Sequence, residues 1–146
     1  MPDFTIAATG DEPWRLKDAA GKKLVIYFYP KDMTSGCTRE SQDFRDLAAA
    51  FRKAGTLIVG VSRDSVVSHD KFVAKESLPF PLLADSDEKL CKLFDVIQEK
   101  SLYGRKYLGI ERSTFLIDGS ARLQQEWRKV KVPGHAEAVL EAAQRL

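Results

Sequence analysis

The chain has 146 residues, of which 44% are hydrophobic and 30% are charged, and this length and balance are typical of one globular domain over 1–146. Its formal net charge of +2, without a long basic run, gives no reason to expect nucleic acid as a partner. The longest apolar runs have the length of strands, whereas a membrane helix needs about 20 apolar residues, so we expect no membrane span.

Two further features bear on the compartment and on the thiols. The segment 1–5 carries an acidic residue and no basic one, unlike the start of a secretory signal. Two cysteines are too few for the disulfide framework of a small secreted domain. We therefore expect a cytoplasmic protein in which each cysteine is a free thiol with its own packing or chemical role.

Five apolar runs along the chain have the pattern of strands. They cover 24–29, 57–62, 80–84, 113–118 and 123–127. The first two are nearly continuous in apolar residues, as expected of central strands that are covered on both faces. Asp118 and Gly119 between the last two runs predict an antiparallel hairpin.

Helical periodicity fills the intervals between these runs. Phe44, Leu47, Ala48 and Phe51 fall at i, i+3, i+4 and i+7, which predicts a helix that stops at Gly55. Further helices are predicted over 64–76, over 87–96 with Ile97 in register, and over 134–146. This alternation predicts an α/β fold with a mixed central sheet and helices on both faces.

Cys37 lies where the first predicted strand passes into the first predicted helix. It precedes Phe44 by seven residues, so its sulfur should lie on the inward stripe of the first turn, with Thr34 or Ser35 as N-cap. Free backbone N–H groups and the helix dipole favour an anion there, and we expect Cys37 to be a thiolate at neutral pH. Pro30 can shield the sulfur and Thr34 can direct its hydroxyl to it. From the spacing alone, packing as a small hydrophobic residue is an equal alternative.

The residues around Cys37 resemble a known active-site signature. The pattern Pro30-x-x-x-Thr34-x-x-Cys37 resembles that of peroxiredoxins. Further segments resemble the bacterioferritin comigratory protein (Q-type) branch: Phe28-Tyr29-Pro30-Lys31-Asp32, Gly36-Cys37-Thr38-x-Glu40, Gly60-Val61-Ser62-x-Asp64-Ser65 and Gly109-Ile110-Glu111-Arg112-Ser113-Thr114-Phe115-Leu116-Ile117. The resemblance covers nearly the whole chain and implies a thioredoxin fold.

The resemblance also implies a reaction. It implies the reduction of hydrogen peroxide or organic hydroperoxides with Cys37 as nucleophile, Thr34 as donor to the peroxide, Pro30 as shield and Arg112 as stabiliser of negative charge. Such a reaction expels hydroxide or alkoxide, so donors must face both the sulfur and the oxygens. Glu40 can hold Arg112 by a charge-assisted bond, the alternatives being a solvated Glu40 and a surface salt bridge for Arg112. No metal and no organic cofactor is needed.

The chain departs from the branch in how oxidised Cys37 would be recycled. The branch often carries a resolving cysteine at the position of Gln42 or, by a rough alignment, of Val73. Cys91 remains, at the margin of a predicted helical stripe, and we favour a structural role for it. We therefore expect a monomeric 1-Cys enzyme that is reduced by thioredoxin, glutaredoxin or a small thiol. A 2-Cys enzyme with Cys91 as the resolving cysteine is the alternative.

Two other classes of function receive less support. A thiol-disulfide oxidoreductase would need a Cys-x-x-Cys pair, but Thr34 and Glu40 occupy the positions three residues from Cys37. A non-catalytic thioredoxin-fold binding module would not need to keep Thr34 and Arg112. His69 and His135 lack metal-ligand spacing, and we expect them at a helix surface and at a helix start, with no metal site.

Overall fold

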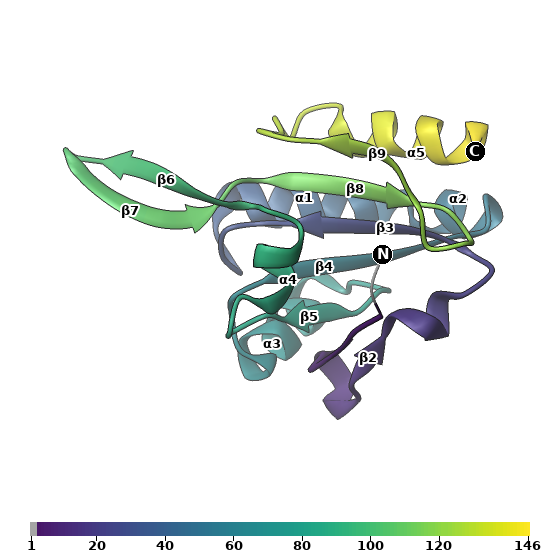
Figure 1. The fold of residues 1–146 in the computed structure, drawn as a ribbon, viewed down its shortest axis with the longest axis horizontal. Coiled ribbons are helices and arrows are strands. Elements are labelled where there is room, and N and C mark those ends of the chain that lie inside the picture. The colour runs from purple at the N-terminus through teal and green to yellow at the C-terminus, as the bar shows by residue number, and fades with distance from the viewer. Residues whose placement is uncertain (1–2) are drawn as a thin grey trace.

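The computed structural model describes residues 3–146 and places a five-stranded mixed sheet at the centre of the molecule (Figure 1). In spatial order its strands are β5 (Leu82–Ala84), β4 (Thr56–Ser62), β3 (Lys23–Phe28), β8 (Ser113–Ile117) and β9 (Leu123–Trp127). Strand β3 pairs in parallel with β4 and antiparallel with β8, β4 pairs in parallel with β5, and β9 pairs antiparallel with β8. All five predicted strands and the predicted hairpin are confirmed.

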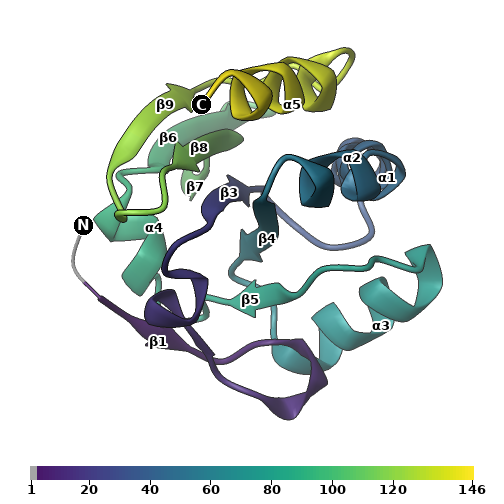
Figure 2. The ribbon, with the colours of Figure 1, turned by 90° about the vertical axis from the view of Figure 1, so that its right-hand side faces the viewer.

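Helices lie on both faces of this sheet, as predicted. They are α1 (Ser35–Asp46), α2 (Ala48–Lys53), α3 (Val66–Glu76), α4 (Lys89–Leu93) and α5 (His135–Arg145). The N-terminal segment contains β1 (Thr5–Ile6), η1 (Thr9–Asp11), β2 (Trp14–Arg15) and η2 (Leu16–Ala19). Figure 2 shows α1 and α2 on one side of the sheet and α4 on the other. Across residues 3–146, no helix is both long and apolar enough to cross a bilayer.

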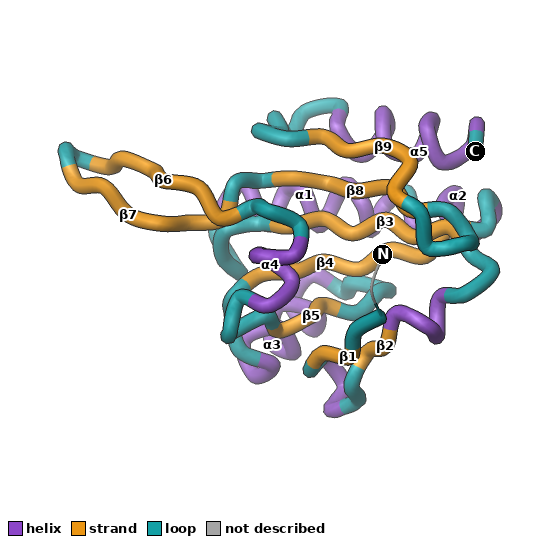
Figure 3. Tube along the Cα trace, viewed as in Figure 1, coloured by secondary structure: helices purple, strands orange, loops and turns teal. Residues whose placement is uncertain are grey.

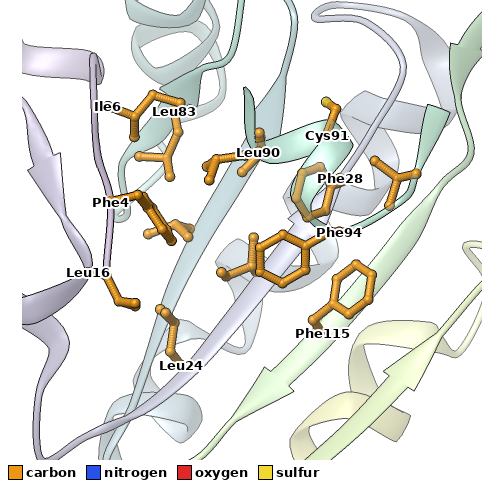
Figure 4. Packing of buried hydrophobic residues seen from close by; sticks show 14 of the residues in the cluster. Phe4, Ile6, Leu16, Leu24, Phe28, Leu83, Leu90, Cys91, Phe94 and Phe115 are labelled. Atoms are coloured by element: carbon orange, nitrogen blue, oxygen red, sulfur yellow. The ribbon is translucent and has the colours of Figure 1, made fainter. Parts of the chain in front are cut away.

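The sheet divides the core into two clusters because alternate side chains of β3 point to opposite faces. Leu24, Ile26 and Phe28 belong to the cluster that contains α4, and Figure 4 shows part of it. Val25 and Tyr27 belong to the cluster that contains α1, α2 and α5. The nearly continuous apolar run of this strand is therefore buried on both sides.

Two predicted helices differ from the observed ones. The helix predicted to run unbroken to Gly55 is divided at Leu47, which ends α1 and precedes α2. Its apolar stripe survives the break, because Phe44 and Phe51 are both fully buried. The helix predicted over 87–96 ends at Leu93, because Asp95 takes a left-handed φ of 55° and Ile97 begins a strand.

A projecting hairpin was not predicted. Strands β6 (Ile97–Leu102) and β7 (Arg105–Ile110) pair antiparallel and extend away from the body (Figure 3). Tyr103 and Gly104 form its two-residue turn, both with positive φ as a type I′ turn requires. Most side chains of β7 are exposed, so the hairpin lacks the apolar alternation by which half-buried strands are recognised.

Candidate active site

Cys37 lies in the first turn of α1 with its side chain directed into the protein. Thr34 is the N-cap residue, and Cys37 is only 1% exposed. It shares the buried face of α1 with Glu40, Ser41 and Phe44, which lie three, four and seven residues further on. The predicted inward position of the sulfur is thus confirmed.

Arg112 lies far from Cys37 in the sequence but close to its sulfur in space. The register of β3 and β8 pairs Phe28 with Ser113, so the residue before Ser113 lies at the sheet end where the loop to α1 begins. One guanidinium nitrogen of Arg112, Nη2, lies 3.4 Å from Sγ of Cys37, and the other, Nη1, lies 2.7 Å from Oε1 of Glu40. Burial alone would lower the pKa of Arg112, but Glu40 and Cys37 raise it overall, so the guanidinium stays charged.

Glu40 is the buried anion of this group. Its side chain is 1% exposed, and its second oxygen, Oε2, lacks a hydrogen-bond partner among residues 3–146. Burial raises the pKa of Glu40 from 4.5 to about 7, although Arg112 acts in the opposite direction. The Glu40 carboxyl group therefore titrates near neutral pH, while Arg112 stays charged.

Gly36 provides the space that the guanidinium occupies. A Cβ atom at this position would lie 3.2 Å from Nη2 of Arg112, closer than most real contacts of Cβ atoms. The absence of a side chain thus lets Arg112 approach the start of α1. No local pattern in the sequence marks this role of Gly36, because Arg112 lies far from it along the chain.

Thr34 and Pro30 occupy the loop between β3 and α1. The exposed Thr34 donates its hydroxyl hydrogen to the carbonyl of Lys31 at 2.9 Å, so in this conformation that hydrogen is not directed at Cys37. A rotation about χ1 would release it. Pro30 is half-buried and follows Tyr29, whose N–H still bonds to Val61 of β4.

A buried polar network holds the same loop, and it corrects one prediction. His69 is 0% exposed, so its predicted position at a helix surface is wrong. Its Nδ1 lies 2.7 Å from Oδ2 of Asp32, and its Nε2 lies 2.9 Å from the carbonyl of Leu83. A carbonyl oxygen only accepts hydrogen bonds, so Nε2 must carry a hydrogen. The carboxylate of Asp32 also only accepts, so the contact at Nδ1 requires a hydrogen on that nitrogen as well. Tyr29 donates to the other oxygen of Asp32 at 2.6 Å.

The carboxyl group of Asp32 is ionised in this network. Burial raises its pKa, but the hydrogen bonds of His69 and Tyr29 outweigh burial and leave the pKa below its ordinary value of 3.8. The backbone N–H of Asp32 in turn donates to Oδ2 of Asp64 at 2.9 Å. The network thus connects the loop before Cys37 to the end of β4 and to α3.

Asp32, Asp64 and His69 also form a group whose potential metal-ligating atoms lie within 4.8 Å of one another. These atoms are engaged in hydrogen bonds within the protein: Oδ2 of Asp64 accepts from both Asp32 and Ser62, and both nitrogens of His69 face acceptors. We therefore assign the group to positioning the loop and not to metal binding.

Cys91 lies in the other core cluster. It is fully buried on α4, and its backbone N–H donates to Oδ2 of Asp85 at 2.7 Å. Figure 4 shows it in the cluster with Phe28 and Phe94. Burial, reinforced by Asp85, raises the pKa of the Cys91 thiol far above its ordinary value. This thiol is poorly suited to act as a nucleophile.

His135 begins α5, as predicted, and is nearly buried. Its Nε2 lies 2.7 Å from the hydroxyl of Thr114 on β8. Burial, together with the charge of Arg112, lowers the pKa of His135 from 6.5 to about 4. It is therefore a neutral packing residue between α5 and the sheet.

Comparisons with known proteins agree on one family. The AhpC/TSA family matches residues 1–126. Peroxiredoxin Bcp of Xanthomonas campestris is 56% identical over 140 residues, covering 96% of this chain and 88% of the relative, and Peroxiredoxin Bcp of Bacillus subtilis is 51% identical, covering 96% and 89%. A solved structure of X. campestris bacterioferritin comigratory protein, studied for its alkyl peroxide reduction activity, superposes with a TM-score of 0.93 at 54% identity, covering 97% of this chain and 90% of that chain. The predicted thioredoxin-type α/β fold is thereby confirmed.

Proposed function

Because the chain belongs to the AhpC/TSA family and is a thiol peroxidase of the peroxiredoxin type, we propose that Cys37 is the nucleophile with which it reduces hydrogen peroxide and alkyl hydroperoxides. The observation that carries this proposal is the 3.4 Å approach of Nη2 of Arg112 to Sγ of Cys37. A buried sulfur beside a fixed cation and a helix N-terminus is suited to nucleophilic attack as a thiolate. One subunit suffices, since Cys37, Glu40 and Arg112 belong to the same chain.

In the proposed reaction, the Cys37 thiolate attacks one peroxide oxygen. An S–O bond forms and the O–O bond breaks, so the sulfur is oxidised by two electrons to sulfenic acid. The other peroxide oxygen leaves as hydroxide or alkoxide, which takes up a proton. Arg112 lies where it can donate to the oxygens as their charge develops. The hydroxyl of Thr34 becomes a second donor once it leaves the carbonyl of Lys31, and Pro30 shields the sulfur.

The proposal includes a 1-Cys cycle. An external thiol (thioredoxin, glutaredoxin or a small thiol) condenses with the sulfenic acid and releases water, and a second thiol reduces the mixed disulfide and regenerates Cys37. Two properties of Cys91 support this cycle over a Cys37–Cys91 disulfide. Cys91 lies in the core cluster on the other face of the sheet, and its raised pKa leaves little thiolate for attack on a sulfenic acid.

Intact mass spectrometry tests this proposal. One equivalent of peroxide should add one oxygen atom to the wild-type protein, and a sulfenic-acid trap should convert that species to its adduct. Cys37→Ser should give neither product and no turnover with any reductant, while Cys91→Ser, the matched control, should behave as wild type. Peroxide consumption by Cys37→Ser above the uncatalysed rate would contradict the assignment of the nucleophile.

A further inference from the structure

Lys100 on the projecting hairpin has a side chain that lies along the hairpin toward its base. The register places Lys100 opposite Tyr107, and Gly109 follows two positions later on the same face. A Cβ atom at Gly109 would lie 3.2 Å from Cδ of Lys100 and 3.1 Å from the Tyr107 ring. The lysine stem and the tyrosine ring therefore both lie over the bare backbone of Gly109, which is nearer to the body of the protein than Tyr107 is.

This direction leads to the candidate active site. Strand β7 ends at Ile110, and Arg112 follows two residues later at the base of the hairpin. Figure 1 shows that the hairpin projects from the end of the sheet at which β3 ends and the chain continues to α1. Burial lowers the pKa of Lys100, and so do the charges of Arg112 and Arg63, whereas the charges of Cys37 and Glu111 raise it. The ammonium group and the site therefore act on each other electrostatically.

In the described part of the chain, Lys100 makes no direct ion pair, although the charge of Glu111 acts on it from a distance. None of the ion pairs within residues 3–146 involves Lys100, whereas Lys106 on the opposite face of the hairpin pairs with Glu99. Arg112 is engaged by Glu40 and faces Cys37. An unpaired, half-buried cation beside a site is available for an anionic group of a ligand.

We propose that Lys100 is a specificity-determining residue that favours hydroperoxides bearing a carboxylate, which its ammonium group binds while the peroxide group reaches Cys37. The proposal rests on the proposed function of Cys37. The half-exposed ring of Tyr107 beside the lysine stem offers apolar contact to the organic part of such a substrate. Hydrogen peroxide lacks both groups and gains nothing from Lys100.

A matched pair of substrates tests the proposal: cumene hydroperoxide and its analogue with a carboxylate in the para position. The wild-type enzyme should show a higher kcat/KM for the carboxylate, and Lys100→Gln should reduce the ratio of the two values by about three- to tenfold, the effect of one partly screened charge pair. About 1 M salt should reduce the wild-type ratio in the same direction. Lys100→Arg should restore the preference.

Lys106→Gln is the matched control, because it removes the same charge from the other face of the hairpin, and its ratio should equal that of wild type. Equal wild-type kcat/KM values for the two substrates would overturn the proposal, and so would an unchanged ratio in Lys100→Gln or an equal loss with both substrates. Failure of the underlying function is separate: it would appear as turnover of either substrate by Cys37→Ser.

Discussion

Cys37 and Cys91 lie on opposite faces of the central sheet. Cys37 packs in the cluster that contains Val25 and Tyr27 of β3, and Cys91 packs with Phe28 of the same strand. A disulfide requires Cα atoms within about 7 Å of each other and sulfurs in contact. The sheet between the two thiols prevents that contact unless α1 or α4 leaves its place.

Cys91→Ser should therefore keep turnover with a small dithiol at the wild-type level. Excess peroxide should drive Cys37 of both proteins to sulfinic acid, because no second thiol intercepts the sulfenic acid. Turnover assays and intact masses under non-reducing conditions check both statements. A wild-type product that has lost two hydrogens and gained no oxygen, absent from Cys91→Ser, would establish the 2-Cys cycle instead.

Arg112→Met should lower the rate of Cys37 oxidation by peroxide by about 100-fold or more, the usual effect of losing one donor to the transition state. Methionine retains an unbranched stem but removes the charge 3.4 Å from Sγ. Stopped-flow measurement of sulfenic acid formation gives the rate. Arg39→Met is the matched control, because Arg39 is exposed on the same helix and pairs with Asp43. A rate within a few-fold of wild type would place Arg112 outside the reaction.

Glu40→Gln should alter how stability depends on pH. Since folding raises the pKa of Glu40 from 4.5 to about 7, the folded protein binds this proton more tightly than the unfolded chain. The resulting stabilisation is complete below about pH 4.5 and is lost as the pH rises through about 7. The free energy of unfolding of the variant should therefore rise relative to that of wild type by on the order of 3 kcal/mol between about pH 4 and 8.

Urea titrations of both proteins across this range measure the difference. Glutamine keeps an oxygen that can accept the hydrogen bond from Arg112, so the comparison isolates the ionisation of the carboxyl group. A difference in unfolding free energy that stays constant with pH would show that Glu40 titrates alike in the folded and unfolded states.

Asp32→Asn should destabilise the fold by about 3–5 kcal/mol at neutral pH, because it leaves His69 buried beside a neutral amide. The pKa of Asp32 is lowered in the folded state, so the stabilisation by its carboxylate is present above the ordinary value of 3.8 and is lost as the pH falls through the folded value. The difference in the free energy of unfolding between the variant and the wild type should accordingly become smaller at acidic pH. Asp70→Asn, on the exposed side of α3, is a control that should cost far less.

The local sequence was sufficient for the strands, most helices and the place of Cys37. A continuous apolar run such as that of β3 is predictable because the hydrophobicity of each residue indicates by itself that the residue is buried. Phe44, seven residues after Cys37, similarly identifies the inward face of α1. The signature around Pro30 and Thr34 indicated the chemistry for the same reason, since its members are close in the chain.

What the sequence did not reveal depends on contacts between distant segments. The resemblance already implied Arg112 beside Cys37, but the role of Gly36 follows only from the β3–β8 register that brings Arg112 to it. Likewise, His69 is buried because it contacts Asp32. The hairpin carrying Lys100 is mostly exposed, so no apolar pattern marks it. Local sequence therefore determined the elements and the place of Cys37, whereas the tertiary structure decided how closely the charged groups approach its sulfur, because electrostatic interactions depend on distance in space and not on separation along the chain.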